Sequence, residues 1–242
     1  MGKDRQGRGI KKGRCVASDF SVMAGIASLF WHVLFPVACP VCGRAGSTGC
    51  LGCIKGVLSP SGPVCIECLN CYPCDRHTLA FPHYFGATHK GPARQLIHLL
   101  KYGHHGALGI SMGRALAACL SFPLPDALVP IPLHNESPRF FNQSEKIAQG
   151  LSLELGVPVM NCLSWNVRIH PRALTKSYAR SKLPEGAFKL DERKLKAGIR
   201  TVMICDDVCT TGATILGAAE TLAKGGLQVL GSASFTLAKG KK

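Results

Sequence analysis

A run near the carboxyl terminus joins an apolar, β-branched segment, two adjacent acids and a Thr/Gly loop, and it strongly limits the folds open to this chain. Residues 202–214 read VMICDDVCTTGAT, and a helical pattern runs from Ile215 to about Lys224. This order predicts a strand, a tight loop and a helix. Open α/β sheets bind ligands at the carboxyl ends of their strands. The run therefore predicts an α/β domain with a ligand site at Asp206 and Asp207.

The chemistry of this run suits a phosphate beside a polyol. Glycine lets the backbone approach an anion closely, and the amides at a helix start can bind a phosphate. The GxxxxGK[ST] spacing is absent, which excludes a nucleoside-triphosphate P-loop. Two adjacent carboxylates can accept hydrogen bonds from vicinal hydroxyls, although helix capping alone is another use of Asp, Thr and Gly at such a corner. The candidate phosphate-loop residues are Thr210, Thr211, Gly212, Ala213 and Thr214.

Eight of the thirteen cysteines form four CxxC pairs between residues 39 and 74. Each pair places two thiolates on one tight turn, which is the usual half-site for tetrahedral zinc. Two pairs close one site, so the spacing predicts one or two Zn²⁺ ions; a disulfide framework is the alternative. The predicted ligands are Cys39, Cys42, Cys50, Cys53, Cys65, Cys68, Cys71 and Cys74.

The formal charge of +15 is concentrated partly at the two ends of the chain. Residues 1–19 are predicted to form a basic, disordered tail. The remaining positive charge favours polyanions such as nucleic acid or a substrate that carries pyrophosphate.

Residues 20–38 contain no Asp, Glu, Lys or Arg. Nineteen residues come close to the length that spans a bilayer, and a basic leader precedes them, so a signal peptide or anchor is one interpretation. The apolar residues Val22, Ile26, Leu29 and Val33 instead follow helical spacing. We expect an amphipathic helix without a stable membrane span, and hence a cytoplasmic protein.

The remaining chain divides into a Cys-rich zinc-binding module over residues 39–76 and an α/β domain over residues 80–238. Gly and Pro are dense in the module, as expected of loops held by metal. Alternating strand and helix patterns then predict a mostly parallel sheet flanked by helices. We expect strands at about 84–87, 127–131, 157–163, 187–190, 201–206 and 227–236, and helices at about 93–102, 108–120, 142–155 and 213–224.

Several short motifs follow one another in an order that resembles a known family. The run 202–214 resembles the phosphoribosyl pyrophosphate (PRPP) signature of type I phosphoribosyltransferases. With CPVCGR at 39–44, PIPLH at 130–134 and FNQ at 141–143, the chain resembles the ComF competence-protein family over roughly residues 25–238. That resemblance implies a type I phosphoribosyltransferase-like domain behind a zinc module, and a role in DNA uptake during natural transformation.

The resemblance also implies roles for particular residues. Asp206 and Asp207 would hold the ribose hydroxyls of PRPP, and the loop 210–214 its 5-phosphate. Mg²⁺ would accompany PRPP, and residues 168–182 would form a mobile hood over the ligand. The pyrophosphate side would be formed by Pro132, Leu133, His134 and Lys101. Single-stranded DNA or a DNA-uptake helicase would be the macromolecular partner.

The sequence departs from the family pattern on the pyrophosphate side. Phe140 stands where relatives usually have Gly, and a bulky residue does not easily adopt the left-handed backbone that Gly permits. No base for activating a nucleophile is evident, so the sequence leaves open whether the protein is an enzyme. A non-catalytic zinc scaffold that binds single-stranded DNA or a competence partner is the first alternative. A base-salvage phosphoribosyltransferase is the second.

Overall fold

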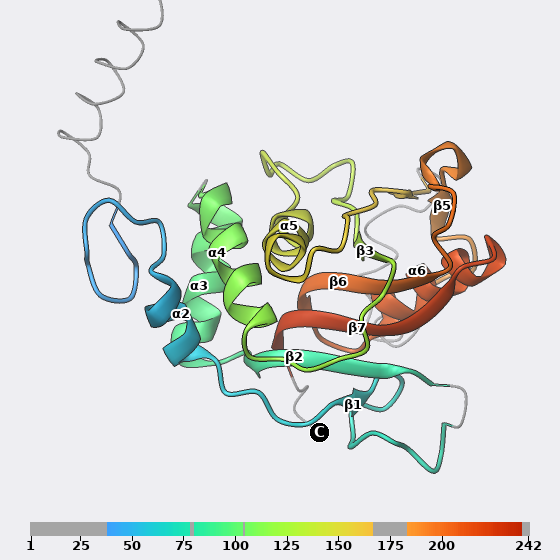
Figure 1. The fold of residues 1–242 in the computed structure, drawn as a ribbon, viewed down its shortest axis with the longest axis horizontal. Helices are drawn as coiled ribbons and strands as arrows, with labels where there is room; N and C mark the ends of the chain where they lie inside the picture. Colours follow the sequence, from blue (N-terminus) through green and yellow to red (C-terminus); the bar gives the residue numbers. More distant parts are fainter. Residues whose placement is uncertain (1–37, 78–79, 104, 167–182, 239–242) are drawn as a thin grey trace, which may run out of the picture. The chain divides into compact units, whose positions relative to one another are not determined.

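Five strands of the computed structural model form one sheet in the order β1-β2-β7-β6-β3 (Figure 1). The structure describes residues 38–77, 80–103, 105–166 and 183–238. The expected tail, the hood and all but the last residue of the expected N-terminal helix lie outside these ranges. The strands are β1 (Val64–Cys65), β2 (Pro82–Thr88), β3 (Ala127–Pro130), β6 (Thr201–Cys209) and β7 (Gln228–Leu237).

Four strands of this sheet run parallel. β2 pairs with β7, β7 with β6 and β6 with β3 in the parallel sense, whereas the short edge strand β1 is antiparallel to β2. The described helices longer than one turn are α2 (Leu51–Val57), α3 (Gly91–Tyr102), α4 (Gly106–Ala117), α5 (Gln143–Leu155) and α6 (Ala213–Lys224). The predicted α/β class with a mostly parallel sheet is therefore confirmed.

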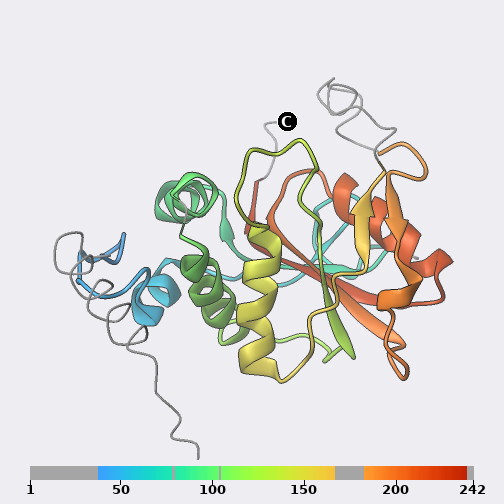
Figure 2. The same cartoon turned by 90° about the horizontal axis from the view of Figure 1, so that it is seen from above.

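Alternation along β6 explains why helices cover both faces of the sheet. Val202 and Ile204 are buried in a core with residues of α6, whereas Met203 and Cys205 are buried with residues of α3, α4 and α5. Successive side chains of a strand point to opposite faces, so an apolar run buries both. Figure 2 shows α4 and α5 on one side of the strands and α6 on the other.

Two glycines allow α4 and α5 to cross closely. A Cβ added at Gly113 would collide with the carbonyl oxygen of Ile147, and one added at Gly150 with the carbonyl oxygen of Ile110. Small residues at a crossing let two helix backbones approach. The first turn of α5 lies beside β6, where the hydroxyl of Ser144 contacts Asp206.

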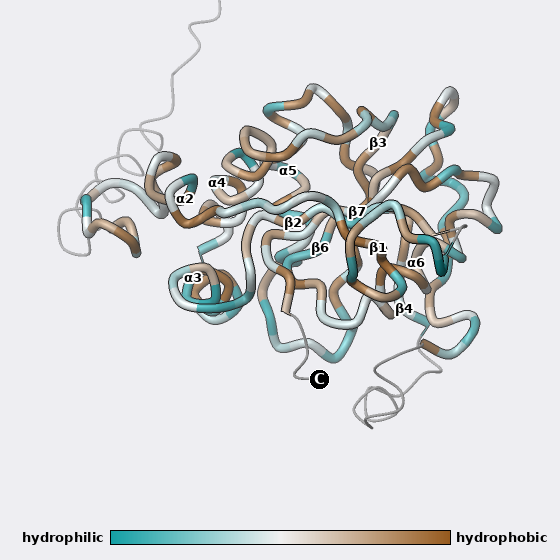
Figure 3. The backbone as a smooth tube through the Cα atoms, turned by 90° about the horizontal axis from the view of Figure 1, so that it is seen from below, coloured by the Kyte–Doolittle hydropathy of each residue, from teal (hydrophilic) through white to brown (hydrophobic). Residues whose placement is uncertain are grey.

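The Cys-rich segment packs against both cores. Ile54 of α2 is fully buried with Leu96 and Leu108 of α3 and α4, while Ile66, which follows β1, is fully buried in the core that contains α6. In Figure 3 the turns of α3 carry both hydrophobic and hydrophilic colours, as expected of a helix with one buried face. The segment that carries the candidate metal ligands therefore packs into the same two hydrophobic cores as the sheet.

Two sequence-based strand boundaries change in the structure. The strand expected at 157–163 is reduced to an isolated bridge between Leu128 and Val159, because Pro158 has no N–H to donate to a continuous ladder. The short strands β4 (Leu163–Trp165) and β5 (Phe188–Leu190) instead form a separate antiparallel pair. β6 continues three residues past 206, so both acids lie within a strand rather than after it.

Candidate functional site

The ends of β6 and β3 and the start of α5 enclose a cavity of about 270 Å³ that contains both acids of the run 202–214. β3 brings the loop that begins at Pro132, and β6 brings Asp206 and Asp207. The start of α6 adds Thr214. Residues more than 70 positions apart therefore meet at one end of the sheet. The cavity is lined by Ile131, Pro132, Leu133, His134, Ser137, Arg139, Asn142, Gln143, Ser144, Trp165, Asp206, Asp207 and Thr214.

Asp206 is held by the first turn of α5. The hydroxyl of Ser144 donates to Asp206 Oδ1 over 2.9 Å, and the backbone N–H of Asp207 donates to the same oxygen over 2.8 Å. Burial, followed by the negative charge of Asp207, raises the pKa of Asp206 to about 7, and the Ser144 hydrogen bond opposes this increase. A carboxyl group with such a pKa can change its charge near neutral pH.

Asp207 pairs with a lysine from α3. Lys101 Nζ lies 2.9 Å from Asp207 Oδ2, although the contact lacks hydrogen-bond geometry and is an ion pair by distance. Lys101 does not line the cavity with the Pro132 loop. It lines a neighbouring hollow of about 390 Å³ with His89 and Arg94, among other residues. The structure thus places this lysine beside the second acid, in the lining of a different hollow from the three pyrophosphate-side residues predicted with it.

The Thr/Gly loop forms the connection from β6 to α6. Gly212 precedes the helix with φ of 79°, in the left-handed region that favours glycine. The Thr211 hydroxyl accepts from the Ala213 backbone N–H over 3.4 Å. Thr210, Gly212 and Thr214 border a small hollow together with Asp206. The predicted phosphate-loop residues therefore lie around the start of a twelve-residue helix, where backbone amides can bind an anion.

Hydrogen bonds fix the loop after β3. Trp165 Nε1 donates to the Pro132 carbonyl over 2.8 Å, and its ring lies 5.3 Å from that of His134. Asn142 Nδ2 donates to the Ile131 carbonyl over 2.9 Å, while its Oδ1 accepts from the Ser144 N–H and caps α5. Asn142 therefore serves as a helix cap and as a loop anchor at once.

Three residues at the candidate sites were not predicted from the sequence. Ser144 directly follows the FNQ motif, and its position at the start of the expected helix could have indicated a role at the site. Trp165 lies on a short strand outside every motif. His77 follows the last CxxC pair by three residues, a spacing that zinc-binding histidines also use.

Seven cysteines and His77 form two groups of four residues. Within each group, all candidate ligand atoms lie within 4.8 Å of one another. In the first group, the Sγ atoms of Cys42 and Cys50 are 3.9 Å apart. In the second, Cys74 Sγ lies 3.4 Å from His77 Nδ1 and 3.7 Å from Cys68 Sγ. Tetrahedral bonds of about 2.0–2.3 Å place ligand atoms roughly 3.3–3.8 Å apart, so both groups fit a metal ion. The groups are Cys39, Cys42, Cys50 and Cys53, and Cys65, Cys68, Cys74 and His77.

The proteins similar to this chain include three bacterial relatives. Competence protein F of Haemophilus influenzae is 33% identical over 109 residues, which cover 43% of this chain and 47% of that protein. DNA utilization protein YhgH of Salmonella typhi is 28% identical over 152 residues, 56% of this chain and 63% of that protein. YhgH of Escherichia coli K12 is 29% identical over 157 residues, 58% and 65% of the two chains.

These relatives support the resemblance to the ComF family. The chain spans between about half and two thirds of the length of the curated relatives that it matches. No family model matches the sequence.

The second candidate metal group differs from the one that the CxxC spacing predicts. Cys71, which the CxxC spacing predicts as a ligand, is exposed and lies outside the group, and His77 takes the fourth position. Cys71 instead forms an isolated backbone bridge with Val64. Only two residues separate Cys68 from Cys71, and both lie in the turn that returns the chain to the edge strand.

The Phe140 substitution is accommodated without left-handed backbone. Among the described residues, Leu69 is the one non-glycine with positive φ, so Phe140 does not adopt the conformation that glycine would favour. Its side chain is 81% exposed. The steric conflict expected at residues 139–143 is therefore absent.

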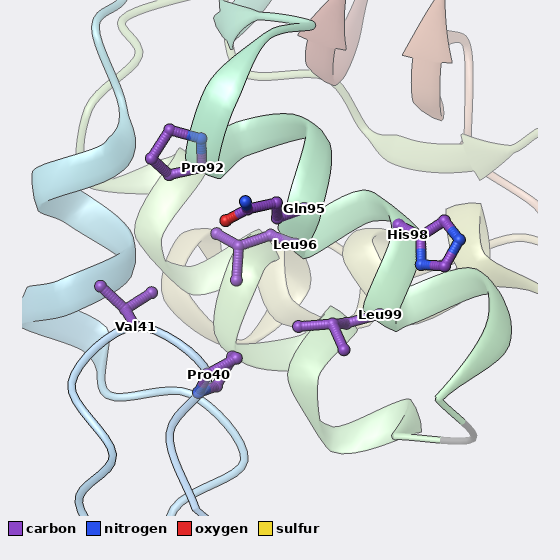
Figure 4. Close-up of a pocket in the computed structure, with 7 residues that line it drawn as sticks. All are labelled: Pro40, Val41, Pro92, Gln95, Leu96, His98 and Leu99. Atoms are coloured by element: carbon purple, nitrogen blue, oxygen red, sulfur yellow. The ribbon is translucent and has the colours of Figure 1, made fainter.

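A separate hollow of about 420 Å³ lies between the first cysteine turn and α3 (Figure 4). Its lining is mostly apolar and includes none of the acids or hydroxyls around Asp206. Pro40 and Val41 face the helix across it, and it is also lined by Pro92, Gln95, Leu96, His98 and Leu99. The larger hollow therefore lacks the polar groups that the cavity at β6 provides.

Within the described ranges, every helix is too short or too polar to traverse a lipid bilayer.

Proposed function

We propose that this chain is a ComF-like protein that binds PRPP at the end of β6 and acts in DNA uptake. One observation carries the ligand proposal: the acids of β6, Thr214 of α6 and the loop from Pro132 line the same cavity. A phosphoribosyl ligand needs acceptors for its hydroxyls and donors for its phosphates. The cavity offers both in adjacent positions.

Each part of the cavity has a role in this proposal. Asp206 and Asp207 accept hydrogen bonds from the ribose hydroxyls, and the amides at the start of α6 bind the 5-phosphate. The loop over Pro132, Leu133 and His134 faces the pyrophosphate. Mg²⁺, bound with PRPP, supplies positive charge that neutralises the pyrophosphate. Oxygen ligands such as these carboxylates are the type that Mg²⁺ prefers.

If the protein catalyses transfer, an acceptor nucleophile bonds to ribose C1 as pyrophosphate leaves with the bonding electron pair, and positive charge develops on the sugar ring. Fixed carboxylates at Asp206 and Asp207 would stabilise that charge in a partly buried site. The raised pKa of Asp206 means that ligand and cation must favour its ionised form. We propose a phosphoribosyltransferase as the reaction class on these grounds.

A binding module without turnover is the second candidate. Of the described residues that line the cavity, Arg139 has the one permanent positive charge, and its guanidinium donates to Gln143 Oε1 over 3.2 Å. A site with few cations provides little stabilisation for pyrophosphate as it leaves. In this candidate the domain is a scaffold or nucleotide sensor that contacts single-stranded DNA or a competence partner. Base salvage is the third candidate.

The two cysteine groups are proposed to bind Zn²⁺. Cys₄ and Cys₃His sets with closed tetrahedral geometry are typical of structural zinc sites. Thiolate ligands persist in a reducing compartment, so we propose a cytoplasmic location. The DNA-uptake role rests on the names of the relatives, Competence protein F and DNA utilization protein YhgH.

Calorimetric titration of the full chain with PRPP and Mg²⁺ tests the ligand proposal. Saturable binding is expected for the native protein and its loss for the variant Asp206→Asn/Asp207→Asn. Asp191→Asn is a matched control, because Asp191 is a carboxylate that pairs with Arg193 outside the cavity. Binding that survives in the double variant, or no binding by folded native protein, would remove PRPP from the proposal. Pyrophosphate release with candidate acceptors then separates the transferase from the binding module.

A further inference from the structure

Ile66 joins the second metal group to the phosphate loop. It follows the ligand Cys65 directly and is fully buried. A Cβ built on Gly212 would collide with the carbonyl oxygen of Ile66 and would lie 3.1 Å from its Cδ1 atom. The loop 210–214 therefore rests on the turn that carries two metal ligands, with no space between them.

Hydrogen bonds hold this turn at the edge of the sheet. The Cys65 N–H donates to the Asn70 carbonyl and the Leu69 N–H to the Cys65 carbonyl, each over 2.7 Å. The Ile66 N–H donates to the Phe81 carbonyl over 3.3 Å. Cys65 also pairs with Pro82 of β2. The peptide that touches Gly212 is thus tied to the sheet on one side and to the ligands on the other.

We expect the order of this turn to depend on metal bound by its ligands. The segment from Cys65 to His77 contains few buried apolar residues, and such segments take much of their folding free energy from bound metal. An anion-binding loop in turn needs its amides held in place before the ligand arrives, because ordering them on binding lowers affinity. The contact between Ile66 and Gly212 connects these two requirements.

We propose that the turn 65–68 positions the phosphate loop, so that metal bound by the second group strengthens anion binding at residues 210–214. The first group has a different surrounding. Its Ile54, which follows the ligand Cys53, is also fully buried but packs with Leu96 and Leu108 in the opposite core. The proposal therefore assigns the positioning role to the second group alone.

The matched variants Ile66→Val and Ile54→Val test the contact in the full chain. Each removes one methylene from a fully buried isoleucine that follows a cysteine ligand, so each perturbs packing similarly. Hydrogen–deuterium exchange of residues 209–216 without ligand is the readout. We expect faster exchange in Ile66→Val and native rates in Ile54→Val. Equal effects of the two variants on this segment would overturn the proposal.

A second pair tests the metal. His77→Ala removes a ligand of the second group, whereas Cys71→Ser changes an exposed cysteine of the same segment that lies outside it. We expect His77→Ala to lose one zinc ion per chain, to accelerate exchange at 209–216 and to weaken PRPP binding at least about fivefold. Cys71→Ser is expected to match the native protein. Native exchange rates in a His77→Ala protein that has lost its metal would overturn the proposal.

The affinity readout rests on the proposed PRPP function, but the exchange readout does not. If native protein fails to bind PRPP, the proposed function fails while exchange at 209–216 still decides the positioning role. If His77→Ala does not fold, the isoleucine pair decides it.

Discussion

Lys101 Nζ lies 2.9 Å from Asp207 Oδ2, which joins α3 to the second acid of the candidate site. Both side chains are largely buried, at 20% and 10% exposure. The pair holds an acid of the β6 run in an environment where an unpartnered charge would be costly. Lys101 therefore contributes to the charge balance of the candidate site.

Lys101→Met is expected to destabilise the protein by about 2–3 kcal/mol, because it leaves the Asp207 carboxylate partly buried without its cation. Urea unfolding measures this change. The double variant Lys101→Met/Asp207→Asn removes both charges and should recover at least half of the loss. Additive effects of the two substitutions would show that the pair contributes no coupling energy.

The stability of the protein should depend on the charge of Asp206. Its pKa in the folded protein is raised to about 7 by burial, above the value of about 3.9 expected in the unfolded chain. The unfolded state therefore releases its proton first as pH rises. The contribution of Asp206 to the free energy of unfolding is therefore greatest below pH 4. It falls by up to ~1.4 kcal/mol per pH unit as pH rises and is lost by about pH 7.

Urea unfolding of native protein and Asp206→Asn between pH 5 and pH 8 isolates this contribution. The native protein should lose stability relative to the variant as pH rises through this range. PRPP affinity should change in the opposite direction, because the ligand needs the ionised carboxylate. Parallel stability curves for the two proteins would contradict the raised pKa.

His83 should make the protein sensitive to acid. Its ring is fully buried between the hydroxyls of Ser232 and Ser234, at 2.8 and 3.0 Å, and burial lowers its pKa to about 3. Below pH 6.5 the unfolded chain binds a proton that the folded protein does not. Stability from this group is therefore lost as pH falls from 6.5 towards 3, by up to ~1.4 kcal/mol per pH unit.

His83→Gln removes the titrating group and should flatten this acid dependence, although it lowers stability at pH 7 through lost packing. Thermal unfolding of both proteins at pH 4.5 and pH 7 measures the difference. An unchanged acid dependence in the variant would assign that dependence to other groups.

The close crossing of α4 and α5 predicts a large penalty for Gly150→Ala. The new methyl group would meet the carbonyl oxygen of Ile110, and we expect a loss of about 3 kcal/mol from overpacking. Gly56→Ala on α2 is the control, because no atom lies within 4 Å of its added Cβ. That variant should be neutral or up to about 1 kcal/mol more stable through helix propensity. Similar unfolding midpoints for both variants would contradict the crossing.

Local patterns were sufficient for the α/β class and for most elements of the sheet. The apolar run before Asp206 predicted β6, and the Thr/Gly loop predicted the start of α6, because strand and helix-start signals depend on neighbouring residues. Such signals do not register the missing N–H of Pro158 in a ladder, and so the strand expected at 157–163 was wrong. They also ended β6 too early, since its last residues are stabilised by pairing with β7.

The sequence predicted the types of candidate site, because paired acids, a Thr/Gly loop and CxxC turns are each contained within a few residues. Which partners complete those sites depended on the folded arrangement. Ser144 reaches Asp206 because α5 packs across the sheet, and Lys101 reaches Asp207 from α3. His77 replaces Cys71 because the chain turns back to the edge strand at that point. Contacts of this kind join residues that are distant in sequence or redirected by a turn, and only packing in three dimensions selects them.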